Sequence, residues 1–240
     1  MITPVSPRPR LEPVQDIRER KLCPPPVASF IGRKDILDKM RSYFDSQNAG
    51  QRVFVLYGLG GGGKSQLAFK FIEESKGKRY ISWSYKITTA ILTNLFLSFS
   101  EIFYVDATSE QTLRTDLEAI YPGNAKRTVD GVSQWLAGQI DRTWLLYFDN
   151  ADDVNLKLKK FFPPCGCGNI LVTTRNRELR HHTAKDADAN VKGMDPSDAI
   201  NLLLHQARAE SNEENIALAE AIVQVSYRIV VAGRDFHTDT

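Results

Sequence analysis

The stretch that decides the fold is residues 53–66, VFVLYGLGGGGKSQ. It opens with an uninterrupted apolar run, which is typical of a strand buried on both faces of a sheet. A cluster of glycines follows, and a lysine and a serine then open an amphipathic segment typical of a helix. Residues 58–65 match the pattern G-x-x-x-x-G-K-[ST] in full. The sequence therefore predicts a strand, a phosphate-binding loop and a helix in direct succession.

These residue types at this spacing suit the phosphate groups of a nucleotide. Glycines let backbone N–H groups converge on a phosphate without side-chain clashes, and a helix N-terminus adds its free N–H groups and the positive end of its dipole. The lysine can reach the β- and γ-phosphates, and the serine can ligate Mg²⁺. The alternative is a glycine-rich turn whose lysine is merely solvated. The predicted phosphate-binding residues are Gly58, Gly60, Gly61, Gly62, Gly63, Lys64, Ser65 and Gln66.

A second apolar run, WLLYFDNADD over residues 144–153, ends in acidic residues. A phosphate loop needs a neighbouring strand that ends in an acid near Mg²⁺. Asp149 is that acid, so Ser65 and Asp149 form the predicted metal pair. Asp152 or Asp153 could in addition cap a helix over residues 154–160. Asn150 stands next to Asp149 and cannot act as a base, so we expect slow hydrolysis of ATP or none.

A third run, NILVTTRN over residues 169–176, places an arginine at the end of another strand. Such an arginine can reach toward a γ-phosphate and report its presence. The alternative is an ordinary surface arginine at a strand end. With the sensor role taken, the predicted catalytic residues are Lys64, Asp149 and Arg175.

Strands alternate with helices along most of the chain, which predicts parallel pairing with right-handed crossovers. The predicted fold is α/β, a three-layer arrangement with a parallel sheet flanked by helices and followed by a partial helical subdomain. Ser109 is a candidate helix cap. Strands are expected over residues 53–57, 102–107, 144–153 and 169–176, with a short fifth near 190–192. Helices are expected over residues 33–46, 65–75, 109–122 and 129–140, and over most of the chain from 196 onward.

Composition narrows the class of protein. The 240 residues are 42% hydrophobic and 25% charged, with a net charge of +2 that is too small to suggest nucleic-acid binding. Three cysteines argue against a disulfide framework and fit a reducing compartment, so we expect a cytoplasmic protein. The uncharged residues 87–100 are shorter than the roughly 20 apolar residues of a membrane span, so no membrane partner is expected. Cys165 and Cys167 alone cannot supply the four ligands of a zinc site.

The order of these motifs resembles the NB-ARC group of STAND NTPases, the nucleotide switches of signalling proteins. The phosphate loop, LLYFDNADD and ILVTTR match in order, and the Asp-Asn-Ala-Asp form is similar to that of fungal NLR-like members. The segment Phe30, Ile31, Gly32 and Arg33 resembles the one that lies against adenine in this group, and GMDPSDAINLLL resembles the connection into its helical subdomain. The resemblance covers roughly residues 27–228.

This resemblance implies an ADP- or ATP-binding signalling switch with Mg²⁺. It implies a P-loop NTPase domain over residues 27–193 and a partial helical subdomain over 194–240, whereas the Pro- and Arg-rich composition of residues 1–26 predicts a disordered leader. Homo-oligomer or effector partners would act through domains outside this sequence. The family's Gly-Leu-Pro-Leu-type segment and winged helix are missing, so we expect a chain truncated after its nucleotide-binding core. The alternatives are an active P-loop ATPase of another class, such as an AAA+ engine, or a non-functional fragment.

Residues 77–99 separate the first helix of the domain from its second strand, where the family has a short link. We expect an insertion here, and a retained intron is favoured over a genuine insertion, since long structureless insertions are uncommon inside compact domains. An in-frame retained intron and a genuine loop or helix insertion both account for it.

Overall fold

The computed structural model describes residues 19–46, 50–76, 99–122, 127–139 and 143–235. Residues 1–18 of the expected leader lie outside these ranges, as does the expected insertion except for Phe99.

The described chain alternates between strands and helices. The strands are β1 (Arg52–Tyr57), β2 (Ile102–Asp106), β3 (Leu145–Asp149), β4 (Asn169–Thr174) and β5 (Asp188–Asn190). The α-helices are α1 (Lys34–Asp45), α2 (Lys64–Ser75), α3 (Glu110–Ile120), α4 (Val129–Ala137), α5 (Pro196–Ala207) and α6 (Glu213–Asp235). Two 3₁₀ helices, η2 (Leu158–Phe161) and η3 (Arg177–His182), flank β4.

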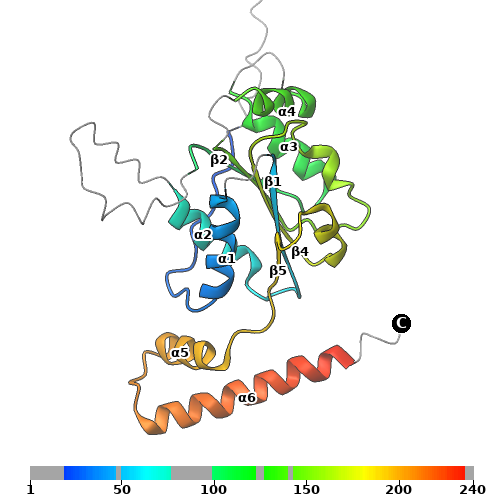
Figure 1. The fold of residues 1–240 in the computed structure, drawn as a ribbon. Coiled ribbons are helices and arrows are strands. Elements are labelled where there is room, and N and C mark those ends of the chain that lie inside the picture. Colours follow the sequence, from blue (N-terminus) through cyan, green and yellow to red (C-terminus); the bar gives the residue numbers. More distant parts are fainter. Residues whose placement is uncertain (1–18, 47–49, 77–98, 123–126, 140–142, 236–240) are drawn as a thin grey trace, which may run out of the picture.

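The five strands form one sheet in the order β2-β3-β4-β1-β5, and all neighbouring strands are parallel. The helices α1 and α2 cover one face, and α3, α4 and the 3₁₀ helices lie on the other side (Figure 1). The predicted three-layer α/β fold with a parallel sheet is confirmed. Because parallel strands end at the same edge, the carboxyl ends of β1, β3 and β4 come together there.

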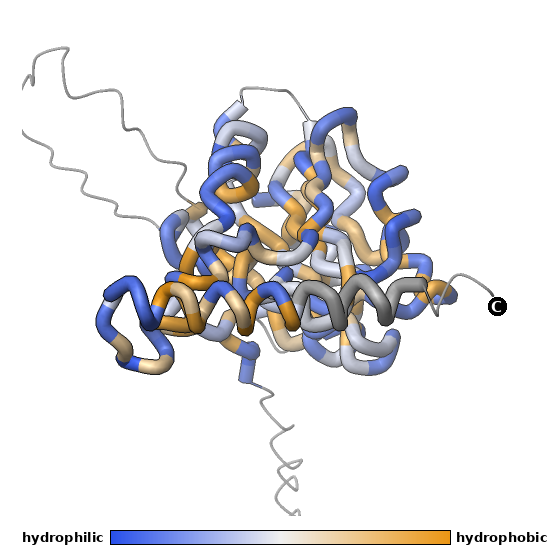
Figure 2. Tube along the Cα trace, turned by 90° about the horizontal axis from the view of Figure 1, so that it is seen from below, coloured by the Kyte–Doolittle hydropathy of each residue, from blue (hydrophilic) through white to orange (hydrophobic). Residues whose placement is uncertain are grey.

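The sheet is buried on both faces. Every residue of β3 and of β4 is buried, as the continuous apolar runs predict, whereas β2 at the edge alternates between buried and half-buried residues. One core cluster joins the sheet to α1 and α2, and it includes an aromatic group of Phe44, Phe54 and Phe71. The other joins the sheet to α3 and α4. Hydrophobic residues accordingly gather inside and hydrophilic residues outside (Figure 2).

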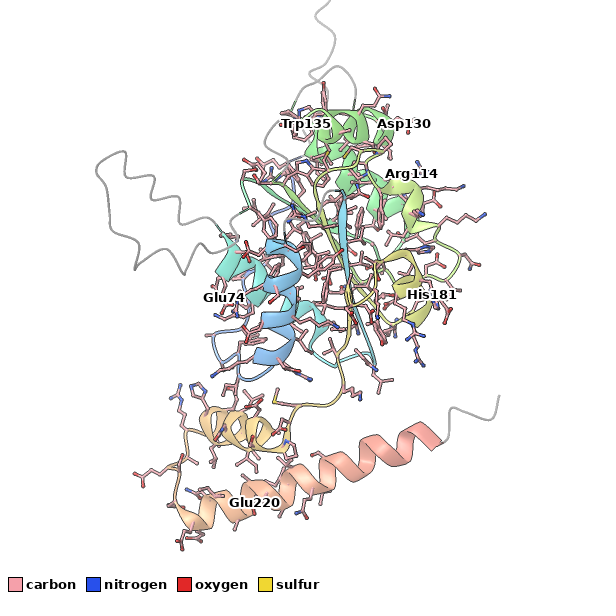
Figure 3. All side chains as sticks on the ribbon, in the orientation of Figure 1. Glu74, Arg114, Asp130, Trp135, His181 and Glu220 are labelled. Atoms are coloured by element: carbon pink, nitrogen blue, oxygen red, sulfur yellow. The ribbon has the colours of Figure 1, made fainter. Side chains whose placement is uncertain are left out.

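The outer faces of both helical layers are polar. Glu74 lies on the α2 side of the sheet, and Arg114 and His181 lie on the opposite side (Figure 3). Arg114 pairs with Glu110 one helical turn earlier at 2.7 Å, an exposed pair of the kind that adds only about 0.3–0.5 kcal/mol. Both helical layers are therefore held against the sheet mainly by the apolar residues of their inner faces.

Two predicted local features can be compared directly with the structure. The expected cap is confirmed, because Ser109 Oγ accepts from Thr112 N at 3.1 Å at the start of α3. The expected helix over residues 154–160 is wrong, since only the short η2 forms there. Asp153 Oδ1 accepts from Asn155 N at 2.8 Å, which closes a tight turn in place of a first helical turn.

Residues 19–26, the end of the expected leader, lie against the domain. Arg20 contacts Glu101 at 3.4 Å and stacks over the Phe103 ring at 4.8 Å, and Lys21 pairs with the buried Asp116 at 2.9 Å. These contacts differ from the flexible leader that the composition indicates, because a long basic side chain can cover apolar surface while its charge finds a carboxylate.

The last two helices pack against each other below the sheet in the view of Figure 1, and Leu204 of α5 and Ala219 of α6 are buried. The start of α5 lies close to Gly32, because a Cβ atom there would lie 2.2 Å from Asp198 Oδ2. Gln206 Nε2 also donates to Ser29 Oγ at 2.5 Å. Within the described residues no helix is both long and apolar enough to span a membrane.

Candidate functional site

The phosphate-binding loop connects β1 to α2, and its backbone needs glycine. Gly58 has φ +146°, and a Cβ atom there would lie 2.5 Å from the carbonyl oxygen of Val191. Gly63 has φ +82° and directly precedes the first residue of α2. These positions favour glycine because L side chains rarely adopt such backbone angles. The loop therefore has the open backbone that a phosphate cradle requires.

Lys64 begins α2 and its ammonium group folds back over the loop. Nζ donates to Gly58 O at 3.0 Å and to Leu59 O at 2.8 Å, and the side chain is only 8% exposed. Burial lowers the pKa of Lys64, and the nearby positive Arg175 lowers it further, whereas Asp152 and Asp149 oppose the shift. A cation held here without a direct carboxylate partner is well placed for an incoming anion.

Asp149, at the end of β3, is a buried carboxylate bonded by hydroxyl groups. Ser65 Oγ donates to Asp149 Oδ1 at 2.7 Å and Tyr147 OH donates to the same oxygen at 2.6 Å. Thr173 Oγ1 donates to it as well, from the neighbouring strand β4. The predicted pair of Ser65 and Asp149 is thus in direct contact, and the other two donors hold the carboxylate in position.

The two tyrosines near Asp149 stay in their neutral, hydrogen-bond-donating form. Burial raises the pKa of Tyr147 well above its ordinary value, and the negative charge of Asp149 raises it further. Burial and then Asp149 likewise raise the pKa of Tyr104, whose OH lies 3.4 Å from Asp149 Oδ2. Their hydroxyl protons are therefore retained across the physiological pH range.

Arg175 follows the last residue of β4 and is bound to Asp152. Arg175 Nε lies 2.6 Å from Asp152 Oδ2, and the backbone N of Arg175 donates to Asp152 Oδ1 at 2.6 Å. The guanidinium reaches back toward the loop, since a Cβ atom on Gly60 would lie 3.7 Å from Arg175 Nη1. Asp152 and Asp153 were both candidate helix caps; instead Asp152 holds the arginine.

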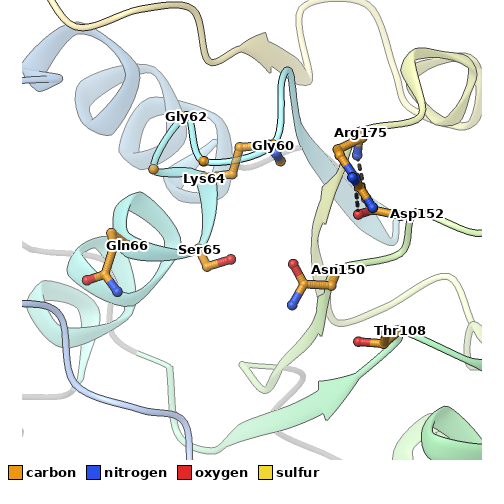
Figure 4. Close-up of a pocket in the computed structure, with 11 residues that line it drawn as sticks. Gly60, Gly62, Lys64, Ser65, Gln66, Thr108, Asn150, Asp152 and Arg175 are labelled. Atoms are coloured by element: carbon orange, nitrogen blue, oxygen red, sulfur yellow. Dashed lines mark hydrogen bonds and ion pairs between the residues drawn. The ribbon is translucent and has the colours of Figure 1, made fainter.

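A cavity of about 480 Å³ lies in front of the loop. Figure 4 shows Ser65, Asn150 and Thr108 facing one space, with the Arg175–Asp152 pair at its side. Asn150 adopts a left-handed backbone conformation, φ +59°, and its N–H donates to Thr173 Oγ1 at 3.0 Å. The cavity is lined by Gly60, Gly61, Gly62, Gly63, Lys64, Ser65, Gln66, Thr108, Asn150, Asp152 and Arg175.

The segment Phe30, Ile31, Gly32 and Arg33 does not line this cavity. Phe30 packs against the core beside α1, and Arg33 donates to the carbonyl oxygens of Lys192 at 2.6 Å and Gly193 at 3.2 Å. Those carbonyls directly follow Val191, which contacts the phosphate-binding loop at Gly58. In the part of the chain that the structure describes, the segment therefore reaches the loop through residues 191–193.

Sequence reasoning missed three residues of the site, Thr108, Tyr147 and Thr173. Thr108 follows β2 and its N–H donates to Asp106 Oδ1 at 3.0 Å. Thr173 is fully buried, and a hydroxyl within an otherwise apolar strand is the signal that could have identified it, since buried polar groups need partners. Tyr147 stands two residues before Asp149 on the same side of β3, which a period-two reading could have found.

The sheet order, the loop between β1 and α2, and the acid at the end of β3 together decide the fold. The fold is that of a P-loop NTPase. Gln66, which was predicted to bind phosphate, lines the cavity, and its Oε1 also accepts from Val27 N at 2.8 Å.

Comparisons with known proteins find a low level of similarity. No family model matches the sequence, and no curated protein matches it. A STAND protein with a tetratricopeptide repeat sensor from Pyrococcus horikoshii is similar over 86% of this chain and 29% of its own, at 20% identity and a TM-score of 0.47.

Two further solved structures are similar to this chain. Cdc6p from Pyrobaculum aerophilum shares 11% identity over 91% of this chain and 65% of its own, and Drosophila ORC bound to DNA shares 9% over 93% and 60%. Both have a TM-score of 0.49. The chain thus spans between 29% and 65% of the length of these three structures. Likeness at this level says nothing about activity.

Proposed function

We propose that this chain binds an adenine nucleotide with Mg²⁺ and acts as a signalling switch of the NB-ARC type, with slow or no hydrolysis of ATP. The contact between Ser65 and Asp149 carries the proposal. It joins the helix that follows the glycine loop to the acid of a separate strand, which is the pairing that a metal-bound triphosphate needs.

The loop fits the phosphates of such a nucleotide. Residues 60–63 leave one side of the cavity free of side chains, and the N-terminus of α2 adds free N–H groups and the positive end of its dipole. Lys64 would turn from the two carbonyl oxygens to the phosphates, where its charge is balanced directly. Phosphate binding would therefore raise the pKa of Lys64 from its lowered value.

The donor set near Asp149 fits Mg²⁺. A hydroxyl and a carboxylate are the hard oxygen ligands that this ion prefers, and water and phosphate oxygens complete its shell. When bound, the ion would neutralise phosphate charge. Ser65 would bind it directly, Asp149 would bind it directly or through water, and Tyr147 and Thr173 would keep the carboxylate oriented.

Slow turnover is expected because the cavity lacks a well-placed base. Asn150 lines the cavity where a second carboxylate would orient water, and an amide cannot take a proton. Asp152 lines it too, but both of its oxygens are bonded to Arg175. Release of Arg175 by a γ-phosphate would distinguish ATP from ADP, and a switch needs such a differential contact.

The segment Phe30 to Arg33 supports an adenine site at the rim. Arg33 fixes the backbone of Lys192 and Gly193 next to the contact between Val191 and Gly58. An adenine base bound between residues 30–33 and 191–193 would influence the position of α5, since Gly32 lies against Asp198 at the start of that helix. We further propose a cytoplasmic location, and homo-oligomer or effector partners reached through domains outside this sequence.

The first test is mass spectrometry of nucleotide retained through purification, followed by thermal shift with Mg-ADP. A ligand that binds only the folded state raises the melting temperature, by an amount that corresponds to about 2.7 kcal/mol at a hundredfold excess over Kd. Lys64→Ala should abolish the shift. Lys70→Ala is the matched control, because Lys70 lies on the same helix and pairs with Glu73 outside the cavity.

Steady-state turnover separates the switch from an engine of the AAA+ class. Retained ADP with turnover near background supports the switch. Sustained fast hydrolysis would instead indicate an active ATPase of the AAA+ class. If a folded sample showed no change in melting temperature with nucleotide, the binding proposal would be wrong.

A further inference from the structure

A pair of cysteines lies at the far end of β4 from Arg175. Cys165 and Cys167 belong to the loop between η2 and β4, separated by Gly166. Their Sγ atoms are 2.7 Å apart, and Cys165 Sγ also lies 3.2 Å from the carbonyl oxygen of Cys167. The two sulfurs are therefore in contact although no bond joins them.

The loop is held on both sides of this pair. Before it, the Pro163 carbonyl accepts from Gln51 Nε2 at 2.9 Å and from Cys165 N at 2.8 Å. After it, Gly168 O accepts from Arg52 N at 3.0 Å. Gly168 also packs on an indole ring, since a Cβ atom there would lie 2.0 Å from Trp144. The two thiols are thus kept together by the fold and not by chance contact of a free loop.

The backbone between the sulfurs is able to bend into a small ring. Cα atoms two residues apart span at most about 7 Å, and a disulfide needs about 4.4–6.8 Å between them. Gly166 has no Cβ atom, and a Cβ built there would meet nothing within 4 Å. The ring can therefore close by a local bend at Gly166 without moving β4.

We propose that Cys165 and Cys167 form a reversible dithiol–disulfide site that is oxidised by small disulfides. Cys165 is half-buried and reachable, whereas Cys167 is only 5% exposed. The more accessible thiol, that of Cys165, is the attacking group, and the buried thiol of Cys167 is the resolving group. Among the described residues no group of three or more His, Cys, Asp or Glu side chains could hold a metal ion.

The third cysteine does not share these properties. Cys23 packs on the opposite helical layer, near α1 and α2. Burial raises the pKa of its thiol to about 12, which leaves almost no thiolate at neutral pH. Cys23 is therefore the natural internal control.

The exchange balances without any other reactant. Cys165 loses its proton to water, and its thiolate attacks one sulfur of the oxidant, so that one thiolate of the oxidant leaves. The Cys167 thiolate then attacks Cys165 Sγ and expels the second thiolate. The protein loses two protons and two electrons, and the oxidant, a disulfide, is reduced to two thiols.

The experiment treats the full chain with oxidised glutathione at neutral pH and records the intact mass, followed by alkylation and peptide mapping. The expected result is a loss of about 2 Da without a retained glutathione, with Cys165 and Cys167 protected from alkylation and Cys23 still modifiable after unfolding. Dithiothreitol should restore the mass.

Variants make the test specific. Cys23→Ser should leave the loss of mass unchanged. Cys167→Ser should instead accumulate a glutathione adduct on Cys165, because the resolving thiol is gone. The proposal is overturned if the wild-type chain keeps its reduced mass, retains a stable adduct, or links through Cys23. This outcome is independent of nucleotide binding.

Discussion

Arg175 and Asp152 engage each other through both the side chain and the backbone of the arginine, at 2.6 Å in each case. The pair stands at the side of the cavity in which a γ-phosphate would lie. Under the proposed function, the same carboxylate would compete with phosphate for the arginine. This competition would lower the affinity for a triphosphate and leave that for a diphosphate unchanged.

Asp152→Asn should strengthen the binding of a non-hydrolysable ATP analogue relative to ADP. The Arg175 side chain is 63% exposed, and such pairs are worth about 0.2–1 kcal/mol, so the ratio of the two Kd values should change by about 1.4- to 5-fold. Fluorescence titration measures both. Asp153→Asn is the control, since Asp153 does not line the cavity. Equal gains for both nucleotides would contradict the competition.

Thr173→Val should destabilise the fold more than Thr174→Val. Both threonines are fully buried, but Thr173 Oγ1 donates to the Asp149 carboxylate and Thr174 Oγ1 to the carbonyl oxygen of Ala151. Hydrogen bonds to charged groups contribute about 1.5–3 kcal/mol and neutral ones about 0.5–1.5. Urea unfolding at unchanged m-value gives both free energies. A larger loss in Thr174→Val would show that Asp149 does not depend on its hydroxyl donors.

Gly58→Ala should disturb the loop, because the new methyl group would meet the Val191 carbonyl at 2.5 Å on a backbone that disfavours alanine. We expect a loss of about 1–3 kcal/mol in the free energy of unfolding together with weaker nucleotide binding. Gly138→Ala, where the nearest atom lies at 3.5 Å and φ is −84°, should stay within about 0.5 kcal/mol of the wild type. Thermal denaturation compares the two, and an unaffected Gly58→Ala would refute the predicted clash.

Nucleotide affinity should fall as the pH rises toward 10.5, the ordinary pKa of lysine. Burial lowers the pKa of Lys64, so the free protein loses this proton below 10.5, whereas bound phosphate favours the charged form. Between the lowered pKa of Lys64 and 10.5, nucleotide binding must therefore take up a proton, and this requirement weakens the affinity as the pH rises. Without nucleotide, the free energy of unfolding should instead rise with pH over the same range. The pKa of Lys64 is lowered in the folded protein, so the unfolded state binds more protons there.

Titration calorimetry in buffers of different ionisation enthalpy measures that proton uptake. Lys64→Arg supplies the contrast, since a guanidinium keeps its charge over the same range, and any binding it retains should not vary with pH through this group. A wild-type affinity that is flat up to 10.5 would contradict the role of the Lys64 charge.

The strand-forming runs were predictable because burial on both faces requires continuous apolar residues, and the glycine loop was predictable because its spacing follows from phosphate chemistry. Asp149 and Arg175 follow from their places at strand ends. The partner of Arg175 was not predictable, because it depends on the turn after β3. Asp153 closes that turn, and this local bond outcompetes the helix expected over residues 154–160.

The position of β5 depended on pairing and not on composition. We expected it near residues 190–192, and it lies over Asp188–Asn190, because Val55 of β1 pairs with Asp188. A three-residue strand carries too little periodicity to fix its own register. Tyr147 and Thr173 were missed for a similar reason, since their shared contact with Asp149 exists only once β3 and β4 lie side by side.

Three hydroxyl groups converge on one oxygen of Asp149, and only one of them, that of Ser65, comes from the loop side. A hydroxyl proton can rotate about its C–O bond while its oxygen stays in place. If a cation bound the Ser65 oxygen, the hydroxyl proton of Ser65 would therefore rotate away from Asp149, and β3 and β4 would not need to shift. Such an ion would then bind and leave while Tyr147 and Thr173 hold the carboxylate of Asp149 in place.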